Sequence, residues 1–384
     1  MTRVDASWGN MRNALRQNRI GGRRDREKLE RDLDRRAFLR AGVRGAGLVG
    51  LGGAVGFAAS RYLPYSVRET AVGGGAPSLD LDKYATVDPA LMQYTEIGKI
   101  QTGFRSMRGI AVDPENRILV AGDRSIKVFG EDAEFLRQIE LGAAPRCLPV
   151  SEEGVLYVGL KDRVEVYDQS GTQQARWHDL GANAVLTSIA VSGDDVFLAN
   201  AGQREILRYT RSAKQVLHFG KKDPSRNMPG FVVPSPYFDL AIGQDGLLKV
   251  ANPGRHRMEA YTLEGDFELS WGEASMGIEG FCGCCNPVNF ALLPDGRIVT
   301  SEKGLPRIKV YEANGSFSGV VAAPRDFEAN QQACCGSAEA SEPTGDVSNC
   351  QSGGIDLATD ARGRVLALDP VEQVVRIFEP LTGT

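Results

Sequence analysis

Short apolar stretches alternate with turn residues from about residue 104 to residue 378, in a phrase that is repeated six times. Each phrase contains an apolar strand, a turn, a second apolar strand, a loop, and a third strand that ends in an aromatic residue. In most phrases a further turn leads to a fourth extended stretch, such as residues 135–141. Short strands separated by turn signals predict antiparallel meanders. The aromatic ends are Phe129, Tyr167, Tyr209, Tyr261, Tyr311 and Phe378.

The repeat length predicts the fold. Units of about 40–50 residues with four short strands each are typical of β-propellers. A single meander cannot bury both of its faces, so the units pack radially and close a ring. A large β-sandwich is the competing all-β fold, but the regular aromatic ends favour a six-bladed β-propeller of four-stranded antiparallel blades.

The sixth unit ends at residues 378–380 with no room for a fourth strand. Residues 94–100, ahead of the first unit, can supply that strand, and ring closure from the other end of the chain leaves no exposed sheet edge. We therefore expect the propeller to span residues 94–380, with an insertion at 322–352. Residues 61–93, which contain three consecutive glycines, are expected to be a linker.

Charge is distributed unevenly along the chain. Residues 1–44 hold thirteen Lys and Arg against six Asp and Glu, whereas the whole chain carries a net charge of −4. The remainder therefore carries about −11, which argues against a nucleic-acid partner, since such proteins neutralise phosphates with basic surfaces.

The basic segment contains the run Asp34-Arg35-Arg36-Ala37-Phe38-Leu39, followed by a weakly apolar stretch at 41–59. It resembles a twin-arginine export signal, in which Arg35, Arg36, Phe38 and Leu39 would be the recognised residues. This resemblance implies that residues 1–60 direct export of a folded, cofactor-loaded protein to the periplasm or the outer face of the cytoplasmic membrane. The apolar stretch is also long enough to remain as an uncleaved anchor, which would be the only membrane contact.

Three stretches of the repeat resemble the NHL-repeat family: residues 292–298 (LLPDGRI) followed by residues 306–311 (PRIKVY), residues 109–113 (GIAVD), and residues 363–367 (GRVLA). The resemblance covers about residues 94–380. It implies the propeller fold and says little about function, since the family includes binding scaffolds, lyases and lactonase-like enzymes.

Six of the seven cysteines fall into two groups: Cys282, Cys284 and Cys285, then Cys334, Cys335 and Cys350. Each group precedes the inner strand of a unit, so both are expected on one face near the channel mouth. Adjacent cysteines diverge along an extended chain, and a disulfide between them is strained. Cys147 aligns with the innermost strand of the second unit and is expected to point at the axis, as a further ligand or as a buried small residue.

Such thiolate density favours a cysteine-bound cofactor, above all an iron–sulfur cluster. A copper or zinc thiolate site, a redox-active dithiol and three structural disulfides with no cofactor are the alternatives. The cluster hypothesis predicts electron transfer or redox sensing, with a redox protein of the cell envelope as partner. The disulfide hypothesis predicts an interaction scaffold.

Three polar residues at equivalent positions of the inner strands suggest another function. Asp239, Asn289 and Asp356 are expected to face the channel, where they could bind a divalent ion in a lactonase- or lyase-like enzyme, or simply water. The only histidines are His178, His218 and His256, too few and too scattered for a zinc site of several histidines. The sequence has no nucleophile elbow and no nucleotide-binding fingerprint.

Overall fold

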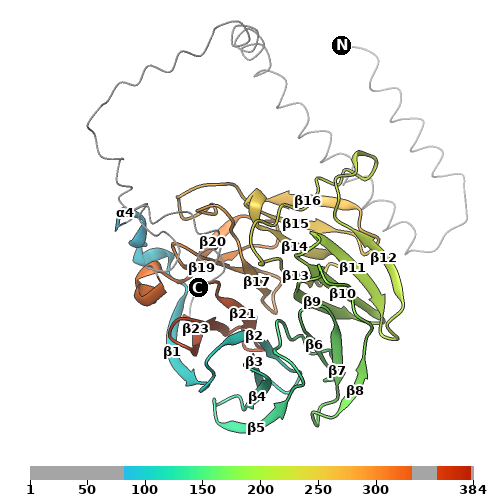
Figure 1. The fold of residues 1–384 in the computed structure, drawn as a ribbon. Coiled ribbons are helices and arrows are strands. Elements are labelled where there is room, and N and C mark those ends of the chain that lie inside the picture. Colours follow the sequence, from blue (N-terminus) through green and yellow to red (C-terminus); the bar gives the residue numbers. More distant parts are fainter. Residues whose placement is uncertain (1–81, 331–352, 382–384) are drawn as a thin grey trace, which may run out of the picture. The chain divides into compact units, whose positions relative to one another are not determined.

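The computed structural model describes residues 82–330 and 353–381, and it confirms a six-bladed β-propeller. Figure 1 shows the sheets following one another around a ring in sequence order, from blue-green β2–β5 to red β21–β23. Within the described residues, no helix is long and apolar enough to cross a membrane.

The first three blades are built from strands that follow one another in the sequence. Blade 1 contains β2 (Met107–Val112), β3 (Ile118–Gly122), β4 (Ser125–Phe129) and β5 (Phe135–Glu140); blade 2 contains β6 (Leu156–Gly159), β7 (Val164–Tyr167) and β8 (Gln173–Arg176); blade 3 contains β9 (Leu186–Ser192), β10 (Asp195–Asn200), β11 (Glu205–Thr210) and β12 (Gln215–Phe219).

The last three blades follow the same order, and the sixth recruits β1, the first strand of the described residues. Blade 4 contains β13 (Leu240–Ile242), β14 (Leu248–Asn252), β15 (Arg257–Tyr261) and β16 (Phe267–Trp271); blade 5 contains β17 (Asn289–Leu292), β18 (Ile298–Glu302), β19 (Arg307–Tyr311) and β20 (Phe317–Ala322); blade 6 contains β21 (Asp356–Thr359), β22 (Val365–Asp369), β23 (Val374–Pro380) and β1 (Tyr94–Gln101). The short helices are α4 (Asp82–Ala85), η1 (Pro89–Leu91), η2 (Pro224–Arg226), η3 (Pro253–Arg255) and η4 (Pro324–Asn330).

Ring closure occurs as the sequence predicts. Strand β1 pairs antiparallel with β23, from Tyr94 opposite Pro380 to Gln101 opposite Val374. The inner strands β21 and β2 are in contact, so blade 6 meets blade 1. This pairing gives hydrogen-bond partners to the backbone N–H and C=O groups along an edge of β23 that would otherwise be exposed.

The second blade differs from the prediction at its inner strand. Residues 147–150 make isolated bridges to Gly159 and Leu156 in place of a regular strand. Pro145 and Pro149 flank and interrupt this segment, and proline has no N–H to give to the ladder.

Each interface between neighbouring blades holds one cluster of buried apolar side chains. Between blades 1 and 6, for example, Ile110 and Val120 pack with Leu366 and Leu368. The aromatic ends of the third strands join these clusters, and in blades 1, 4 and 5 they also meet an aromatic residue across the following turn. The rings of Tyr261 and Phe267, for example, lie edge-to-face with centroids 5.6 Å apart. The repeating aromatic signature therefore reports packing between blades.

Candidate functional site

The connections that enter each inner strand all lie on one face of the ring, because successive strands of a blade run antiparallel. We call this the mouth face. The β16–β17 connection, which carries Cys282, Cys284 and Cys285, belongs to it. So do the β12–β13 connection and residues 353–355, which lead into β21.

A turn at Gly283 and hydrogen bonds of the Asn286 side chain hold the cysteine loop, residues 282–285. Gly283 has φ +76°, a conformation that a side chain would strain, and it reverses the chain between Cys282 and Cys284. The Asn286 side chain donates to the carbonyl oxygens of Cys282, at 2.6 Å, and Lys303, at 3.0 Å. It also accepts from the Lys303 N–H at 2.9 Å. The loop is therefore tied to the end of β18.

A buried charge cluster supports the same loop. Glu302 lies 2.8 Å from both Arg307 and Lys309, and all three side chains are at most 1% exposed. Arg307 and Lys309 also donate to the backbone carbonyl oxygens of residues 276, 277, 278 and 280. Burial lowers the pKa of Lys309 to about 8 despite the attraction of Glu302. These side chains therefore fix the course of the β16–β17 connection.

Cys282 faces this cluster. Its N–H donates to Glu302 Oε2 at 2.7 Å. Burial, and then the neighbouring Glu302 carboxylate, raise the pKa of the Cys282 thiol to about 12. This thiol is therefore protonated at neutral pH and buried.

Cys284 and Cys285 form a different environment. Their sulfur atoms lie 3.3 Å apart, with Cys284 exposed and Cys285 buried. The Ser235 hydroxyl donates to Cys285 Sγ at 3.4 Å, and Lys303 Nζ donates to Ser235 Oγ at 3.1 Å. Burial alone would raise the pKa of Cys285, but the Ser235 hydrogen bond, the Lys303 charge and the Cys284 hydrogen bond outweigh it and lower the pKa. Cys285 therefore ionises more readily than Cys282.

The structure describes none of the cysteines of the second group, only the residues that follow them from 353 onward. Cys334, Cys335 and Cys350 lie outside the described residues, as do Arg35, Arg36, Phe38 and Leu39. The chain is described again from Gly353, and the Gly354 N–H donates to the Tyr237 hydroxyl at 3.2 Å. A side chain at position 354 would collide with the Tyr237 ring, so this close approach requires glycine. Tyr237 in turn lies under Lys303 Nζ, 4.6 Å from the ring centroid.

Cys147 lies apart from this pair. It is buried in the apolar cluster between blades 2 and 3, and its sulfur packs over Gly159. Burial, and then the Asp356 charge, raise the pKa of its thiol. Its predicted role as a ligand stays a prediction.

The channel residues join adjacent blades. Asp239 accepts from the Phe290 N–H at 2.8 Å, Asp356 accepts from the Ile110 N–H at 3.1 Å, and the Asn289 amide donates to the Ile355 carbonyl at 2.9 Å. Burial raises the pKa of Asp239 to about 6, and burial together with Asp239 raises that of Asp356 to about 7. These contacts give all three residues a structural role, and ion binding by them stays a prediction.

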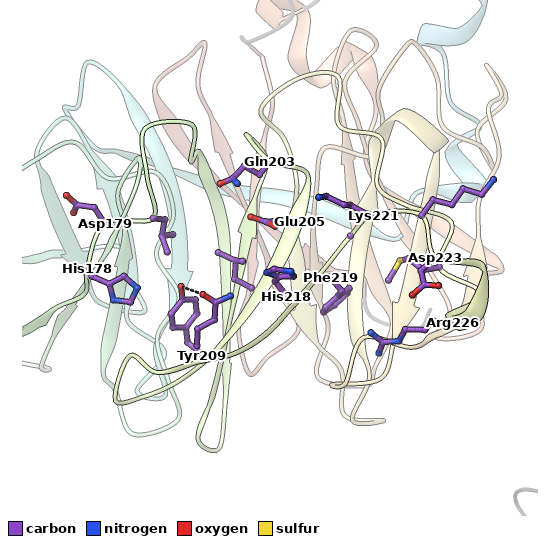
Figure 2. Close-up of a pocket in the computed structure, with 16 residues that line it drawn as sticks. His178, Asp179, Gln203, Glu205, Tyr209, His218, Phe219, Lys221, Asp223 and Arg226 are labelled. Atoms are coloured by element: carbon purple, nitrogen blue, oxygen red, sulfur yellow. Dashed lines mark hydrogen bonds between the residues drawn. The ribbon is translucent and has the colours of Figure 1, made fainter.

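A cavity of about 690 Å³ lies between blades 2, 3 and 4. Figure 2 shows its lining residues, with His178 on one side and His218 near the centre. Its charged residues largely have partners: Arg226 pairs with Asp266, and Glu205 accepts from Asn200. His256 lies elsewhere, with Nε2 2.9 Å from the Gly283 carbonyl oxygen of the cysteine loop. Across the described ranges, no three Cys, His, Asp or Glu side chains gather closely enough to hold a metal ion.

Sequence reasoning missed the residues that tune the thiol pair. Ser235 and Tyr237 come from blade 4 and Lys303 from blade 5, with no motif around any of them. The nearest signal was the length of the β12–β13 connection, which separates the aromatic ends of units 3 and 4 more widely than those of units 2 and 3.

Comparison with known proteins supports the fold. No family model matches the chain, and no curated protein matches it. Among solved structures it is similar to a streptogramin B lyase, with TM-score 0.52 and 11% identity over 77% of this chain and 100% of that one. Virginiamycin B lyase from Staphylococcus aureus gives TM-score 0.50 and 12% identity, over 75% and 99%. A protein of unknown function from Bacteroides thetaiotaomicron gives 0.50 and 14%, over 74% and 72%. At these identities the likeness shows the propeller fold alone, and NHL membership stays a prediction.

Proposed function

We propose that this propeller is a redox protein of the cell envelope, exported by the twin-arginine route, that works through a thiolate centre built on Cys284 and Cys285. The observation that supports this proposal is the contact between an exposed and a buried thiol, 3.3 Å apart, beside a buried lysine. A partner can reach Cys284, while Ser235 and Lys303 favour the reactive thiolate form of Cys285.

The pair suits a soft metal cofactor, of which an iron–sulfur cluster is our first choice. Two thiolates that share one tetrahedral ion lie about 3.8 Å apart, close to the separation of this pair. Lys303 would offset the negative charge of the thiolates. Such a cofactor would supply single-electron transfer to a redox partner. Cys334, Cys335 and Cys350 are the proposed further ligands, whereas the protonated Cys282 is better suited to hold the loop on Glu302.

A dithiol function is the second candidate, and the direct contact between the two sulfurs favours it. In that reaction the Cys285 thiolate and the Cys284 thiol form an S–S bond while a disulfide of a partner protein is reduced to one thiol and one thiolate. The S–S bond needs an approach to about 2.0 Å and a strained ring between adjacent residues, which makes the bond easy to reduce.

Metal and acid-labile sulfide analysis of protein purified without oxygen tests the first candidate. We expect iron and sulfide in the wild type, their loss in Cys284→Ser and Cys285→Ser, and their retention in Cys147→Ser, whose thiol is buried between blades 2 and 3. Two reactive thiols without metal, which oxidise and reduce reversibly, would support the dithiol instead. If all seven cysteines are in stable disulfides or unreactive and no metal is present, both candidates are wrong and the scaffold hypothesis remains.

A further inference from the structure

A second cavity lies on the axis of the propeller, at the mouth face, with a volume of about 330 Å³. All six blades contribute to its wall. Arg108, Arg146 and Thr187 come from blades 1, 2 and 3, while Tyr237, Asn289 and Asp356 come from blades 4, 5 and 6. The cavity is therefore a product of ring closure, and no single repeat contains it.

Three arginines line one side of this cavity: Arg105, Arg108 and Arg146. Their backbones are fixed, since the Arg105 N–H donates to Asp123 and the Arg146 N–H donates to the Gly159 carbonyl. Their guanidinium groups make no ion pair or hydrogen bond with any other residue in the described ranges. Most other arginines of the blades have carboxylate partners, such as Arg376 with Glu96 and Asp369.

Local irregularities of the inner strands orient the wall of the cavity. Arg108 is the extra residue of a β-bulge, because Met107 and Gly109 pair with the consecutive residues Gly122 and Ala121. Thr187 occupies the same kind of position in blade 3, between Leu186 and Ser188. Bulges redirect a side chain and are common beside functional sites. Arg108 is accordingly exposed in a strand whose neighbouring residues are buried, and it lines the cavity.

Within the described ranges, the three arginines of this wall have no carboxylate partner. Burial, and then the neighbouring Arg108 charge, lower the pKa of Arg146. Among the described residues that line the wall, Asp356 is the only carboxylate, and its raised pKa of about 7 leaves it partly neutral near pH 7. Like charges that converge on a cavity without counter-ions are stabilised by an anion that enters it.

We propose that the channel mouth binds a small anionic molecule, which Arg105, Arg108 and Arg146 recognise through its carboxylate or phosphate group. Guanidinium groups bind both kinds of oxyanion in paired hydrogen bonds. The Tyr237 hydroxyl and the Asn289 amide provide polar contacts on the opposite side. A cavity of this size admits a metabolite and excludes a folded protein.

The bound anion would lie beside the thiol pair. Tyr237 forms part of the cavity wall and its ring also contacts Lys303, which holds Ser235 against Cys285. The inference does not depend on the proposed redox function, since no cysteine lines the cavity within the described residues. We expect Cys284→Ser protein to bind the anion as the wild type does.

Isothermal titration calorimetry of the full chain at low ionic strength tests the proposal, with inorganic phosphate and citrate as the two probes. We expect one or both to bind once per chain. In the variant Arg108→Gln/Arg146→Gln the affinity should fall at least about tenfold, since each lost charged hydrogen bond weakens binding by about that factor. Arg105→Gln alone should have a smaller effect in the same direction.

A matched control separates local recognition from net charge. Arg117→Gln/Arg297→Gln also removes two positive charges, but from turns on the opposite face, where both arginines pair with nearby carboxylates. We expect it to bind like the wild type. Failure of both probes to bind the wild type would overturn the proposal, as would equal losses in the two double variants when circular dichroism shows both folded.

Discussion

At the scale of single residues, the reactivity of Cys285 depends on two side chains that are distant from it in the sequence. Ser235 donates to its sulfur, and Lys303 donates to Ser235 while supplying a positive charge. Burial works in the opposite direction, because it disfavours the thiolate. The lowered pKa is the net result of these contributions, so Lys303 is the residue whose removal should reverse it.

We predict that Lys303→Met slows alkylation of Cys285 by iodoacetamide at pH 7 several-fold and moves the rate profile to higher pH. The thiolate is the form that reacts, and the lowered pKa lets Cys285 ionise at lower pH than an ordinary cysteine. Loss of the Lys303 charge raises this pKa, so that a higher pH is needed for the same rate. Rates are measured by peptide mass spectrometry in a Cys284→Ser background.

The control for this prediction is Lys249→Met, which removes a lysine that pairs with Asp245 in the β13–β14 turn on the opposite face. An unchanged profile in Lys303→Met, or the same displacement in Lys249→Met, would mean that Lys303 does not set the pKa.

At the scale of elements, β18 and β19 act as the support of the cysteine loop. Glu302 from β18 and Arg307 and Lys309 from β19 form a buried charge cluster whose cations also bind the carbonyl oxygens of the β16–β17 connection. Such a cluster contributes little stability compared with apolar packing, but breaking it leaves buried charges without partners. Its role is therefore to specify the loop conformation.

Replacing Glu302 with Gln should lower the free energy of unfolding by about 3–5 kcal/mol, because two buried cations lose their counter-ion. Hydrogen exchange of the amides in residues 274–285 should also become faster than in the wild type. Urea unfolding and exchange mass spectrometry measure the two effects.

Glu153→Gln serves for comparison, since Glu153 pairs with Arg211 at the surface and should matter little. If Glu302→Gln were as stable as Glu153→Gln, with unchanged exchange in the loop, the supporting role of the cluster would be refuted.

At the scale of the whole molecule, one strand from the beginning of the described chain completes the ring. Ile100 of β1 is 3% exposed and packs in the cluster between blades 1 and 6, whereas Ile97 of the same strand is 49% exposed. An aspartate at position 100 would place a charge in this buried cluster, whereas an aspartate at position 97 would lie in water. Comparing the two variants therefore tests whether packing of β1 in the cluster closes the ring, independently of the tendency of β1 to form a strand.

We expect Ile100→Asp to destabilise the propeller by several kcal/mol and to promote association through the freed edge of β23. Ile97→Asp should keep the elution volume of the wild type, with a stability within about 1 kcal/mol of it. Urea unfolding and size-exclusion chromatography measure both. Equal behaviour of the two variants would show that β1 is dispensable for closure.

The sequence by itself determined the number of blades, the closing strand, and the face of the ring that carries the cysteine loop. Each of these follows from local patterns: alternation along a strand, an aromatic residue at the end of every third strand, and the spacing of turns. The structure added the irregular second blade, whose inner strand is interrupted by Pro149. That departure too has a local cause.

Only the tertiary structure decided which side chains meet on the mouth face. Cys282 faces a buried carboxylate while Cys284 and Cys285 touch each other, because Gly283 turns the chain between them. Ser235 and Tyr237 come from blade 4 and Lys303 from blade 5, and the three arginines of the mouth come from blades 1 and 2, with no shared spacing in the sequence. Ring closure brings them together, and contacts between blades leave no periodic signal in the chain.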